Sequence, residues 1–265
     1  MWYKLKRIMM RPNGVEKQVY PKNFSTQWPC PDGFHVPLKS EWEAINNAGI
    51  SLWAWNSSNW NWTKTYLKLP FSWARSRSTS NPDAWWTSWW YWTSNASSNT
   101  QQAYCFLNSS TEANASWWQW KSVGRCIRAM RNNSIAPDST WTVLKQWTWT
   151  AGIYHNSSLW LISLSSDWTT RYTIADKNLW ATTVYNDWNT LSEANCGKFY
   201  QRWNNYWFPY SWSVTTSSSQ VNAGSYWPWN YYSSSTFILR SSSPEWWDSS
   251  NNANLRWWVD GNAPA

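Results

Sequence analysis

Four cysteines and two histidines are the side chains with which this chain could hold a metal ion or form a covalent bond. The cysteines are residues 30, 105, 126 and 196, and the histidines are residues 35 and 155. The chain has no CxxC pair and only two histidines, so its cysteine and histidine spacing supports a zinc site poorly, and we expect no metal site. His35 stands in an apolar, proline-flanked segment, which predicts a hydrogen-bonded structural residue. His155 stands alone and is expected to face solvent.

Tryptophan occupies many positions where a tight turn favours glycine. The chain has 32 tryptophans and 8 glycines among 265 residues. Asn61-Trp62, Asp167-Trp168 and Asp187-Trp188-Asn189 place tryptophan next to Asn or Asp, where a type I′ turn needs the positive φ of glycine. Five Trp-Trp doublets lie in segments rich in Ser, Thr and Asn, at 85–86, 89–90, 117–118, 246–247 and 257–258.

This pattern leads to the hypothesis that most of the tryptophans stand for glycines. Some bacteria of the candidate phyla read the codon UGA as glycine, whereas other translation tables read it as Trp. Trp and Gly together make 40 of the 265 residues, an ordinary glycine share for a loop-rich β protein. The hypothesis predicts tryptophans with strained positive φ at turns and many exposed indoles. The alternative is a genuine Trp-rich protein that binds sugars or membranes through aromatic faces.

Two patterns typical of active sites arise once Trp is read as Gly. Residues 115–122 become ASGGQGKS, the loose form of a phosphate-binding loop, but such a loop needs a preceding strand and a following helix. A strand-like segment follows here. Residues 86–90 become GTSGG, near the GDSGG of a serine-protease nucleophile, but that chemistry also needs a positioned His and Asp. A glycine-rich turn before a strand explains the second pattern better, and we predict neither nucleotide binding nor proteolysis.

Calcium-dependent sugar binding and glycoside hydrolysis have weak support in the sequence. The nearest match to the EPN or QPD motif of calcium sites is Asn81-Pro82-Asp83, and the chain contains no WND segment. Glycosidase chemistry needs two carboxylates about 5–10 Å apart, but acidic residues are few, and Glu41 and Glu43 belong to a predicted helix. We therefore expect no cofactor and no catalytic residue.

Charge and hydropathy limit the class of partner. The chain has 22 Lys and Arg against 14 Asp and Glu, a net charge of +8, and only 14% charged residues, where about 25% is usual. The basic residues are densest near the N-terminus, and no RNA-binding signature accompanies them, so we expect no nucleic-acid partner. No run of 18 apolar residues occurs, so no transmembrane segment is expected. No signal peptide is visible either.

The chain is expected to form two units joined by a linker. Residues 1–20 are a basic leader, 21–131 a compact first unit, 132–150 a polar linker and 151–265 a second, truncated unit. Leu38–Asn47 is predicted to be a helix, with Ser40 as N-cap and Glu43 completing a capping box. Short apolar runs predict strands at Tyr66–Leu69, Tyr91–Thr93, Ala103–Leu107, Val123–Ile127, Ile153–Tyr154, Leu159–Leu164 and Arg171–Ile174.

A series of spaced motifs marks the first unit. They are CPDGFHVP at 30–37, SEW at 40–42, YWTS at 91–94, AY at 103–104 and SVGRCIR at 122–128. In this order they resemble the CPxGWHVPxxxEW, YWSS, AY and SVRCV elements of the Fibrobacter succinogenes major paralogous domain, with Gly124 inserted in the last. By this pattern Trp42 and Trp92 are expected to be true tryptophans. The motif residues are Cys30, Gly33, His35, Pro37, Glu41, Trp42, Tyr91, Trp92 and Cys126.

Two segments of the second unit resemble the start of a related repeat. TIADKNL at 173–179 is similar to the family's AENL opening, and NCGKFY at 195–200 to its NCxKYGxLY element. The chain would thus hold the back of one repeat followed by the front of another. The family is similar to C-type-lectin-like domains, which implies an α+β fold. It would have one or two short helices and a small, irregular antiparallel sheet, followed by a partial β-rich second repeat.

The resemblance also carries expectations about chemistry and function. The family positions of Cys30 and Cys126 bracket the first unit, which implies a disulfide if the protein is exported, although Cys105 could pair with Cys126 instead. Family members are typically surface or secreted proteins. We therefore expect a non-enzymatic extracellular or cell-surface module for adhesion or ligand binding in a repeat protein, with a polysaccharide or protein ligand. One alternative is a carbohydrate-binding accessory module of a degradative enzyme. Another is an enzyme akin to the formylglycine generators, which would need reactive cysteine chemistry in a cleft.

Overall fold

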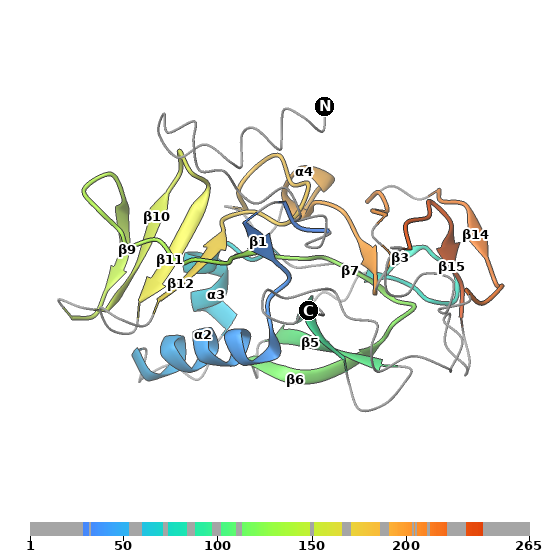
Figure 1. Ribbon diagram of the computed structural model, residues 1–265, viewed down its shortest axis with the longest axis horizontal. Coiled ribbons are helices and arrows are strands. Elements are labelled where there is room, and N and C mark those ends of the chain that lie inside the picture. The colour runs from blue at the N-terminus through green and yellow to red at the C-terminus, as the bar shows by residue number, and fades with distance from the viewer. Residues whose placement is uncertain are drawn as a thin grey trace, which may run out of the picture.

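The structure is a computed structural model of the whole chain. It describes residues 29–31, 33–52, 60–70, 74–83, 88–96, 102–109, 113–148, 151–165, 171–185, 191–202, 204, 206–210, 213–221 and 232–240. Within these ranges three helices and fifteen strands form an α+β architecture with several small sheets (Figure 1). The expected leader at 1–20 lies outside the described residues.

Helix α2 (Lys39–Leu52) begins one residue after the predicted start at Leu38 and ends five residues beyond the predicted end at Asn47. The backbone N–H of Leu38 donates to Glu41 Oε2 at 2.7 Å, and that of Lys39 donates to Asn95 Oδ1 at 2.6 Å. These bonds satisfy two of the N–H groups that a helix start leaves without partners. The N-terminal cap is therefore completed by Glu41, and the prediction of Ser40 with Glu43 was wrong.

A three-stranded antiparallel sheet lies beside α2 (Figure 1). Its strands are β4 (Ser88–Ala96), β5 (Gln102–Ser109) and β6 (Ala113–Trp120), in that order. Trp42 of α2 stacks on Phe106 of β5, with ring centroids 4.4 Å apart and planes inclined by 4°. The expected strands Tyr91–Thr93 and Ala103–Leu107 are confirmed within β4 and β5. Strand β6 was not expected.

A six-stranded antiparallel sheet forms another layer, with the order β1-β8-β12-β11-β10-β9. One face is apolar: Ile153, Ile162 and Ile174 pack into the same core as Trp42. Because side chains alternate along a strand, the opposite face carries the intervening residues, many of them small or polar. The strand bounds are β1 (Phe34–His35), β8 (Met130–Arg131), β9 (Thr142–Gln146), β10 (Gly152–Asn156), β11 (Leu161–Ser165) and β12 (Arg171–Ala175).

The remaining elements are short. Four two-residue strands form an antiparallel sheet in the order β13-β7-β2-β3, and β14 and β15 pair in parallel. Their bounds are β2 (Ala74–Arg75), β3 (Pro82–Asp83), β7 (Gly124–Arg125), β13 (Tyr200–Gln201), β14 (Thr216–Ser217) and β15 (Phe237–Ile238). The other two helices are α3 (Trp60–Leu67) and α4 (Glu193–Cys196).

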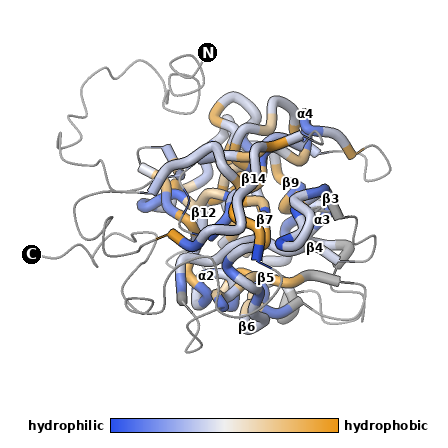
Figure 2. Tube along the Cα trace, turned by 90° about the vertical axis from the view of Figure 1, so that its right-hand side faces the viewer, coloured by the Kyte–Doolittle hydropathy of each residue, from blue (hydrophilic) through white to orange (hydrophobic). Residues whose placement is uncertain are grey.

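Helix α3 replaces the strand predicted at Tyr66–Leu69. Trp62 and Tyr66 are four residues apart, as are Thr63 and Leu67, so they share a helix face. Trp62, Thr63 and Leu67 are buried. This spacing is helical, whereas the prediction of a strand rested only on the apolar residues among 66–69. The hydropathy of the described chain changes over short stretches (Figure 2), and none of its helices is long and apolar enough to cross a membrane.

The structure departs from the expected division into two units. The predicted linker at 132–150 contains β9, and β8 at the end of the first unit pairs both with β1 of the same unit and with β12 of the second. Strand β7 of the first unit likewise pairs with β13 of the second. Short strands on both sides of the expected boundary thus complete the same sheets. The two halves are not separate units among the described residues.

Three buried arginines join segments that are distant in sequence. Arg75 Nε donates to the carbonyl of Pro209 at 2.9 Å, and Arg128 Nη1 donates to that of Ala175 at 2.9 Å. Arg202 donates to the carbonyls of Thr93 and Ser94. Burial lowers the pKa of all three guanidinium groups, that of Arg75 to about 10 and that of Arg202 to about 9. Each arginine connects the first half of the chain to the second.

Some of the tryptophans show the strain and exposure predicted from the sequence. Trp160 and Trp180 have φ values of 56° and 67°, in the region that favours glycine. Trp117 and Trp118 are 40% and 44% exposed. The turn expected at Asn61-Trp62 is wrong, because Trp62 is a buried helical residue. Trp168 and Trp188 lie outside the described residues.

Candidate functional site

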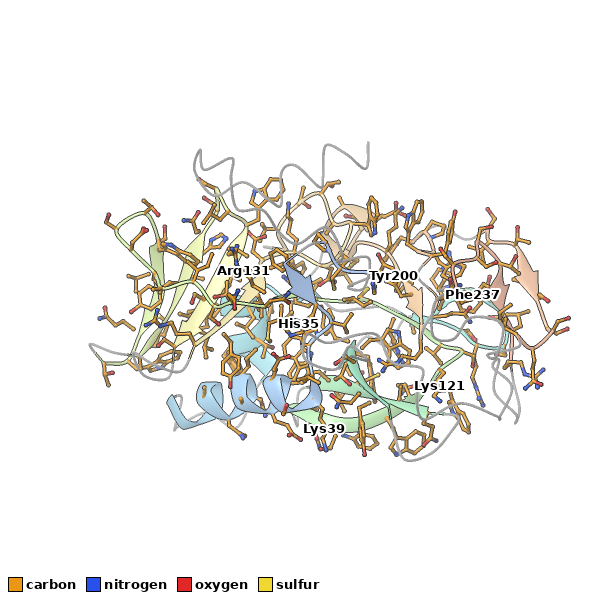
Figure 3. All side chains as sticks on the ribbon, in the orientation of Figure 1. His35, Lys39, Lys121, Arg131, Tyr200 and Phe237 are labelled. Atoms are coloured by element: carbon orange, nitrogen blue, oxygen red, sulfur yellow. The ribbon has the colours of Figure 1, made fainter. Side chains whose placement is uncertain are left out.

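His35 of the expected motif is held by hydrogen bonds at both ring nitrogens. Its Nε2 lies 2.9 Å from Glu41 Oε2, and its Nδ1 lies 2.8 Å from Asn132 Oδ1. The residue is 5% exposed and lies on β1 near Arg131 of β8 (Figure 3). Glu41 therefore joins the helix start to the first strand. This geometry agrees with the structural role predicted for His35.

The aromatic residues of the motif are also internal. Trp42, Tyr91 and Trp92 have no exposed surface. The hydroxyl of Tyr91 donates to the carbonyl of Pro70 at 2.8 Å, and the indole N–H of Trp92 donates to the carbonyl of Tyr200 at 2.8 Å. The motif also shapes the backbone, since Gly33 has φ +82° and the carbonyl of Pro37 accepts the N–H of Ser94 at 2.8 Å. These residues build the fold and leave no reactive group at the surface.

The four cysteines are buried thiols, and the expected Cys30–Cys126 disulfide is not formed. Cys30 packs in one apolar cluster with Cys105, whereas Cys126 belongs to the other cluster. Cys126 lies instead beside Cys196. Burial raises the pKa of Cys105 and of Cys196 to about 12, and it raises those of Cys30 and Cys126 as well. Thiols of this kind are poor nucleophiles at neutral pH.

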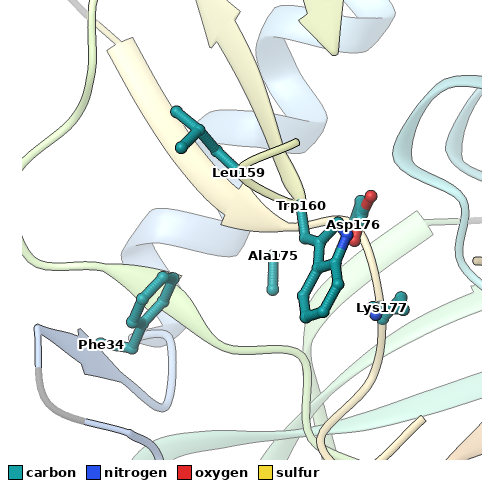
Figure 4. Close-up of a pocket in the computed structure, with 6 residues that line it drawn as sticks. All are labelled: Phe34, Leu159, Trp160, Ala175, Asp176 and Lys177. Carbon is teal, nitrogen blue, oxygen red and sulfur yellow. The ribbon is translucent and has the colours of Figure 1, made fainter. Parts of the chain in front are cut away.

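His155 does not stand alone as predicted, because its Nε2 lies 2.9 Å from Oδ2 of the buried Asp176. Next to this pair is a small hollow, in which Trp160 and Lys177 lie on one side and Phe34 across from them (Figure 4). Lys177 Nζ lies 3.5 Å from the centre of the Trp160 ring. The hollow measures about 10 Å³, which has room for about one water molecule. It is too small to bind a sugar or a cofactor.

A larger hollow opens on the polar face of the six-stranded sheet, and we call it the outer-sheet hollow. Its volume is about 100 Å³. It is lined by side chains of mixed chemistry, two aromatic rings, a carboxylate, a guanidinium and a hydroxyl among them. The lining residues are Pro137, Asp138, Trp141, Val143, Tyr154, Ser165 and Arg171.

The strand register explains how this hollow forms. Val143 is opposite Tyr154, and Ser165 is opposite both Gly152 and Arg171, so these residues share one face of the sheet. A Cβ at Gly152 would lie 3.1 Å from the Tyr154 ring and 2.7 Å from a backbone oxygen. The ring of Tyr154 therefore lies close over a glycine. Small residues form the floor, and larger ones form the walls.

The segment at 134–140 crosses the same face and closes one side of the hollow. Ser134 Oγ donates to the carbonyl of Arg171 at 2.7 Å, and Ser163 Oγ donates to that of Ile135 at 3.1 Å. Asn156 Nδ2 donates to Thr140 Oγ1 at 3.2 Å. Hydrogen bonds from three strands thus fix a stretch that was expected to be a linker. The walls of the hollow are held by the sheet.

The hollow contains one acidic and one basic side chain. The N–H and hydroxyl of Thr140 both donate to Asp138 Oδ1, at 2.8 and 2.6 Å. These hydrogen bonds lower the pKa of Asp138, so its carboxylate is ionised at neutral pH. Arg171 follows at the start of β12. A ligand in the hollow would meet both an acceptor and a set of donors.

The exposed indoles of β6 do not form a common binding face. Trp117 and Trp118 are adjacent in a strand at the sheet edge, and successive side chains of a strand point to opposite sides. Trp117 contacts Trp90 edge-on at 6.1 Å, whereas Trp118 contacts Trp120 at 6.3 Å. Arg77 lies 4.1 Å from the Trp120 ring. The two exposed rings thus face different surroundings.

The other patterns considered from the sequence form no site. Residues 115–120 of the sequence that resembles a phosphate-binding loop belong to β6, and a turn follows them where a helix would be needed. Residues 88–90 of the GTSGG-like segment begin β4, and 86–87 lie outside the described residues. Pro82 and Asp83 of the calcium-like motif form β3. Within the described ranges no group of three His, Cys, Asp or Glu side chains could hold a metal.

No family model, curated protein or solved structure matches the chain. The function must therefore be argued from the geometry of the molecule itself. The sequence did not predict the outer-sheet hollow, because Asp138 and Trp141 both fall within the expected linker at 132–150. A signal was present in LISLS at 161–165, where serine alternates with apolar residues and indicates a strand with one polar face.

Proposed function

We propose that this protein is a non-enzymatic extracellular or cell-surface module that binds a ligand for adhesion. The observation that carries the proposal is the outer-sheet hollow, which is open and lined by aromatic, charged and hydroxyl side chains. Ligand sites typically combine apolar and aromatic surface with a few placed polar groups. The ligand is a polysaccharide or a protein surface.

The rigidity of the hollow supports this proposal. Tyr154 of β10 and Arg171 of β12 lie on strands that both pair with β11, and the crossing segment is hydrogen-bonded to all three strands. A site whose groups are already in place loses less conformational entropy when a ligand binds. Such a site on a sheet face suits an adhesion module.

The second candidate is a carbohydrate-binding accessory module of a degradative enzyme. Tyr154 favours it, since its half-buried ring lines the hollow and flat aromatic surfaces pack against the apolar faces of sugar rings. Asp138 would accept hydrogen bonds from sugar hydroxyls, and Arg171 would donate to them. Both candidates use the same hollow, and they differ in the ligand and in the protein that carries the module.

The test is a binding assay with a double variant, Asp138→Asn with Arg171→Gln. The protein is applied to immobilised neutral and acidic polysaccharides and to surface proteins, and the affinity is measured by surface plasmon resonance. Hydrogen bonds to charged groups contribute about 1.5–3 kcal/mol, so we expect the variant to bind at least ~10-fold more weakly. Glu43→Gln removes an exposed carboxylate on α2 and is the matched control, expected to bind like the parent.

The outcomes separate the candidates. Binding to a protein that the double variant loses favours the adhesion module. Binding to a polysaccharide fits both candidates, and a catalytic domain elsewhere in the same gene would then favour the carbohydrate-binding module. Equal loss in Glu43→Gln would point to a general charge effect. Undiminished binding by the double variant would contradict the assignment of the hollow as the ligand site.

A further inference from the structure

Cys126 and Cys196 lie together although 70 residues separate them. The thiol of Cys126 donates to the carbonyl oxygen of Cys196 at 3.4 Å. Both side chains are fully buried. Cys126 follows β7, and Cys196 ends α4, so their meeting depends on the fold and not on local sequence.

Hydrogen bonds hold the backbone on both sides of this pair. Asn178 Nδ2 donates to the carbonyl of Cys196 at 3.0 Å. The next residue, Leu179, donates its N–H to the carbonyl of Ile127 at 3.0 Å and accepts the N–H of Lys198 at 3.2 Å. The segment at 178–179 therefore bridges the chain after Cys126 and the chain around Cys196. The relative position of the two cysteines is fixed by the surrounding backbone.

The electrostatics agree with this proximity. Burial is the main cause of the raised pKa of Cys126, and a negative charge on Cys196 would raise it further. Two neighbouring thiolates would repel each other inside the protein. A disulfide between them removes both ionisable groups and keeps the same apolar volume.

We propose that Cys126 and Cys196 form a disulfide bond when the protein folds under oxidising conditions. This pairing replaces the expected Cys30–Cys126 bond. The oxidant is a small-molecule disulfide: one cysteine thiolate attacks it and releases one thiolate, and the second cysteine thiolate then displaces the other. The two cysteines lose two protons and two electrons, and the oxidant is reduced to two thiols. Since thiolates react and buried thiols do not ionise readily, the bond forms during folding, before burial is complete.

The test is peptide mapping of the full chain after refolding. One sample refolds with oxidised and reduced glutathione and another with dithiothreitol, and free thiols are then alkylated before trypsin digestion without reductant. We expect a linked pair of peptides, 126–128 and 178–198, in the first sample only, which separates on reduction. Linkage of Cys126 to Cys30 or Cys105, or alkylation of Cys126 and Cys196 in both samples, would overturn the proposal.

Variants provide a second readout. Cys126→Ser and Cys196→Ser should each abolish the linked pair, whereas the double variant Cys30→Ser with Cys105→Ser should retain it. We expect oxidation to raise the Tm of the parent by roughly 5–10 °C, because a cross-link over a long loop restricts the unfolded chain. The same Tm in oxidised and reduced parent would contradict the bond. The peptide map of the parent decides the question even if a serine variant fails to fold.

Discussion

At the residue scale, Trp160 and Trp180 have a backbone conformation that favours glycine. At φ 56° and 67°, a residue with a Cβ incurs about 1–2 kcal/mol of strain that glycine avoids. Trp160 recovers part of this through its contact with Lys177, whose ammonium lies 3.5 Å from the ring centre. Both positions are places where the hypothesis of recoded glycine can be examined.

We predict that Trp160→Gly destabilises the protein less than Trp120→Gly, by about 1–2 kcal/mol. Both side chains are half-buried, and each ring contacts a cation, Lys177 in one case and Arg77 in the other. Trp160 has the positive φ, and Trp120 lies in a regular strand. Urea unfolding monitored by circular dichroism measures the difference.

If Trp160→Gly were the more destabilising substitution, the contacts of the Trp160 ring would contribute more stability than the backbone strain removes. An independent check is the mass of the 178–198 peptide from the native organism. Glycine at positions 180 and 188 is expected from the recoding hypothesis. Tryptophan at both positions would identify an authentic indole-rich protein and strengthen the case for sugar or membrane binding.

At the scale of elements, the start of α2 depends on two neighbouring carboxylates with different tasks. Glu41 accepts the N–H of Leu38 and contacts His35, whereas Glu43 forms an exposed pair with Lys39 at 3.5 Å and accepts the hydroxyl of Ser116. The bonds of Glu41 to the helix start and to β1 are partly buried, whereas the bond of Glu43 to Ser116 of β6 is exposed. The pair therefore provides a matched comparison on one helix.

We expect Glu41→Ala to lower the free energy of unfolding by about 1–3 kcal/mol, because it removes a helix cap and the carboxylate that contacts His35 Nε2. Glu43→Ala should cost about 0.5 kcal/mol or less, as exposed ion pairs do. Both are measured by urea unfolding at neutral pH. Equal effects of the two substitutions would contradict the role assigned to Glu41.

The elements also show which parts of the fold the sequence could reveal. The strand predictions at 91–93, 103–107, 153–154 and 171–174 agree with the structure, since each is a local apolar pattern. Strand β6 was missed because its Trp-rich sequence gives no alternation of polar and apolar residues. The outer-sheet hollow combines Asp138 with residues from four strands, β9 to β12, and no local sequence pattern predicts such a register. Contacts between segments that are distant in sequence likewise determine which cysteines lie side by side.

At the scale of the whole molecule, the two halves of the chain complete each other. Strand β8 connects β1 to β12, and β7 pairs with β13. Arg128 and Arg202 add buried hydrogen bonds between the halves. The expected back and front of two repeats thus form one set of sheets.

We therefore predict that the fragments 1–150 and 151–265 do not fold separately but assemble when mixed. Each would expose the unpaired strand edges and apolar surface that the other covers. Circular dichroism and thermal unfolding of each fragment and of their equimolar mixture measure this. A cooperative transition in either fragment alone would restore the original division into two units.

The shared sheets also determine how the molecule responds to mechanical load. The N–H of Arg240 donates to the carbonyl of Arg77 at 2.7 Å, and Gln201 binds backbone groups of both Ser122 and Ile238. A force applied at residues 33 and 240 would act on these hydrogen bonds between early and late segments of the chain. We expect the molecule to resist extension as a whole and then to unfold in one step. It would serve as a stiff link in a pulled chain, without lengthening by successive opening of domains.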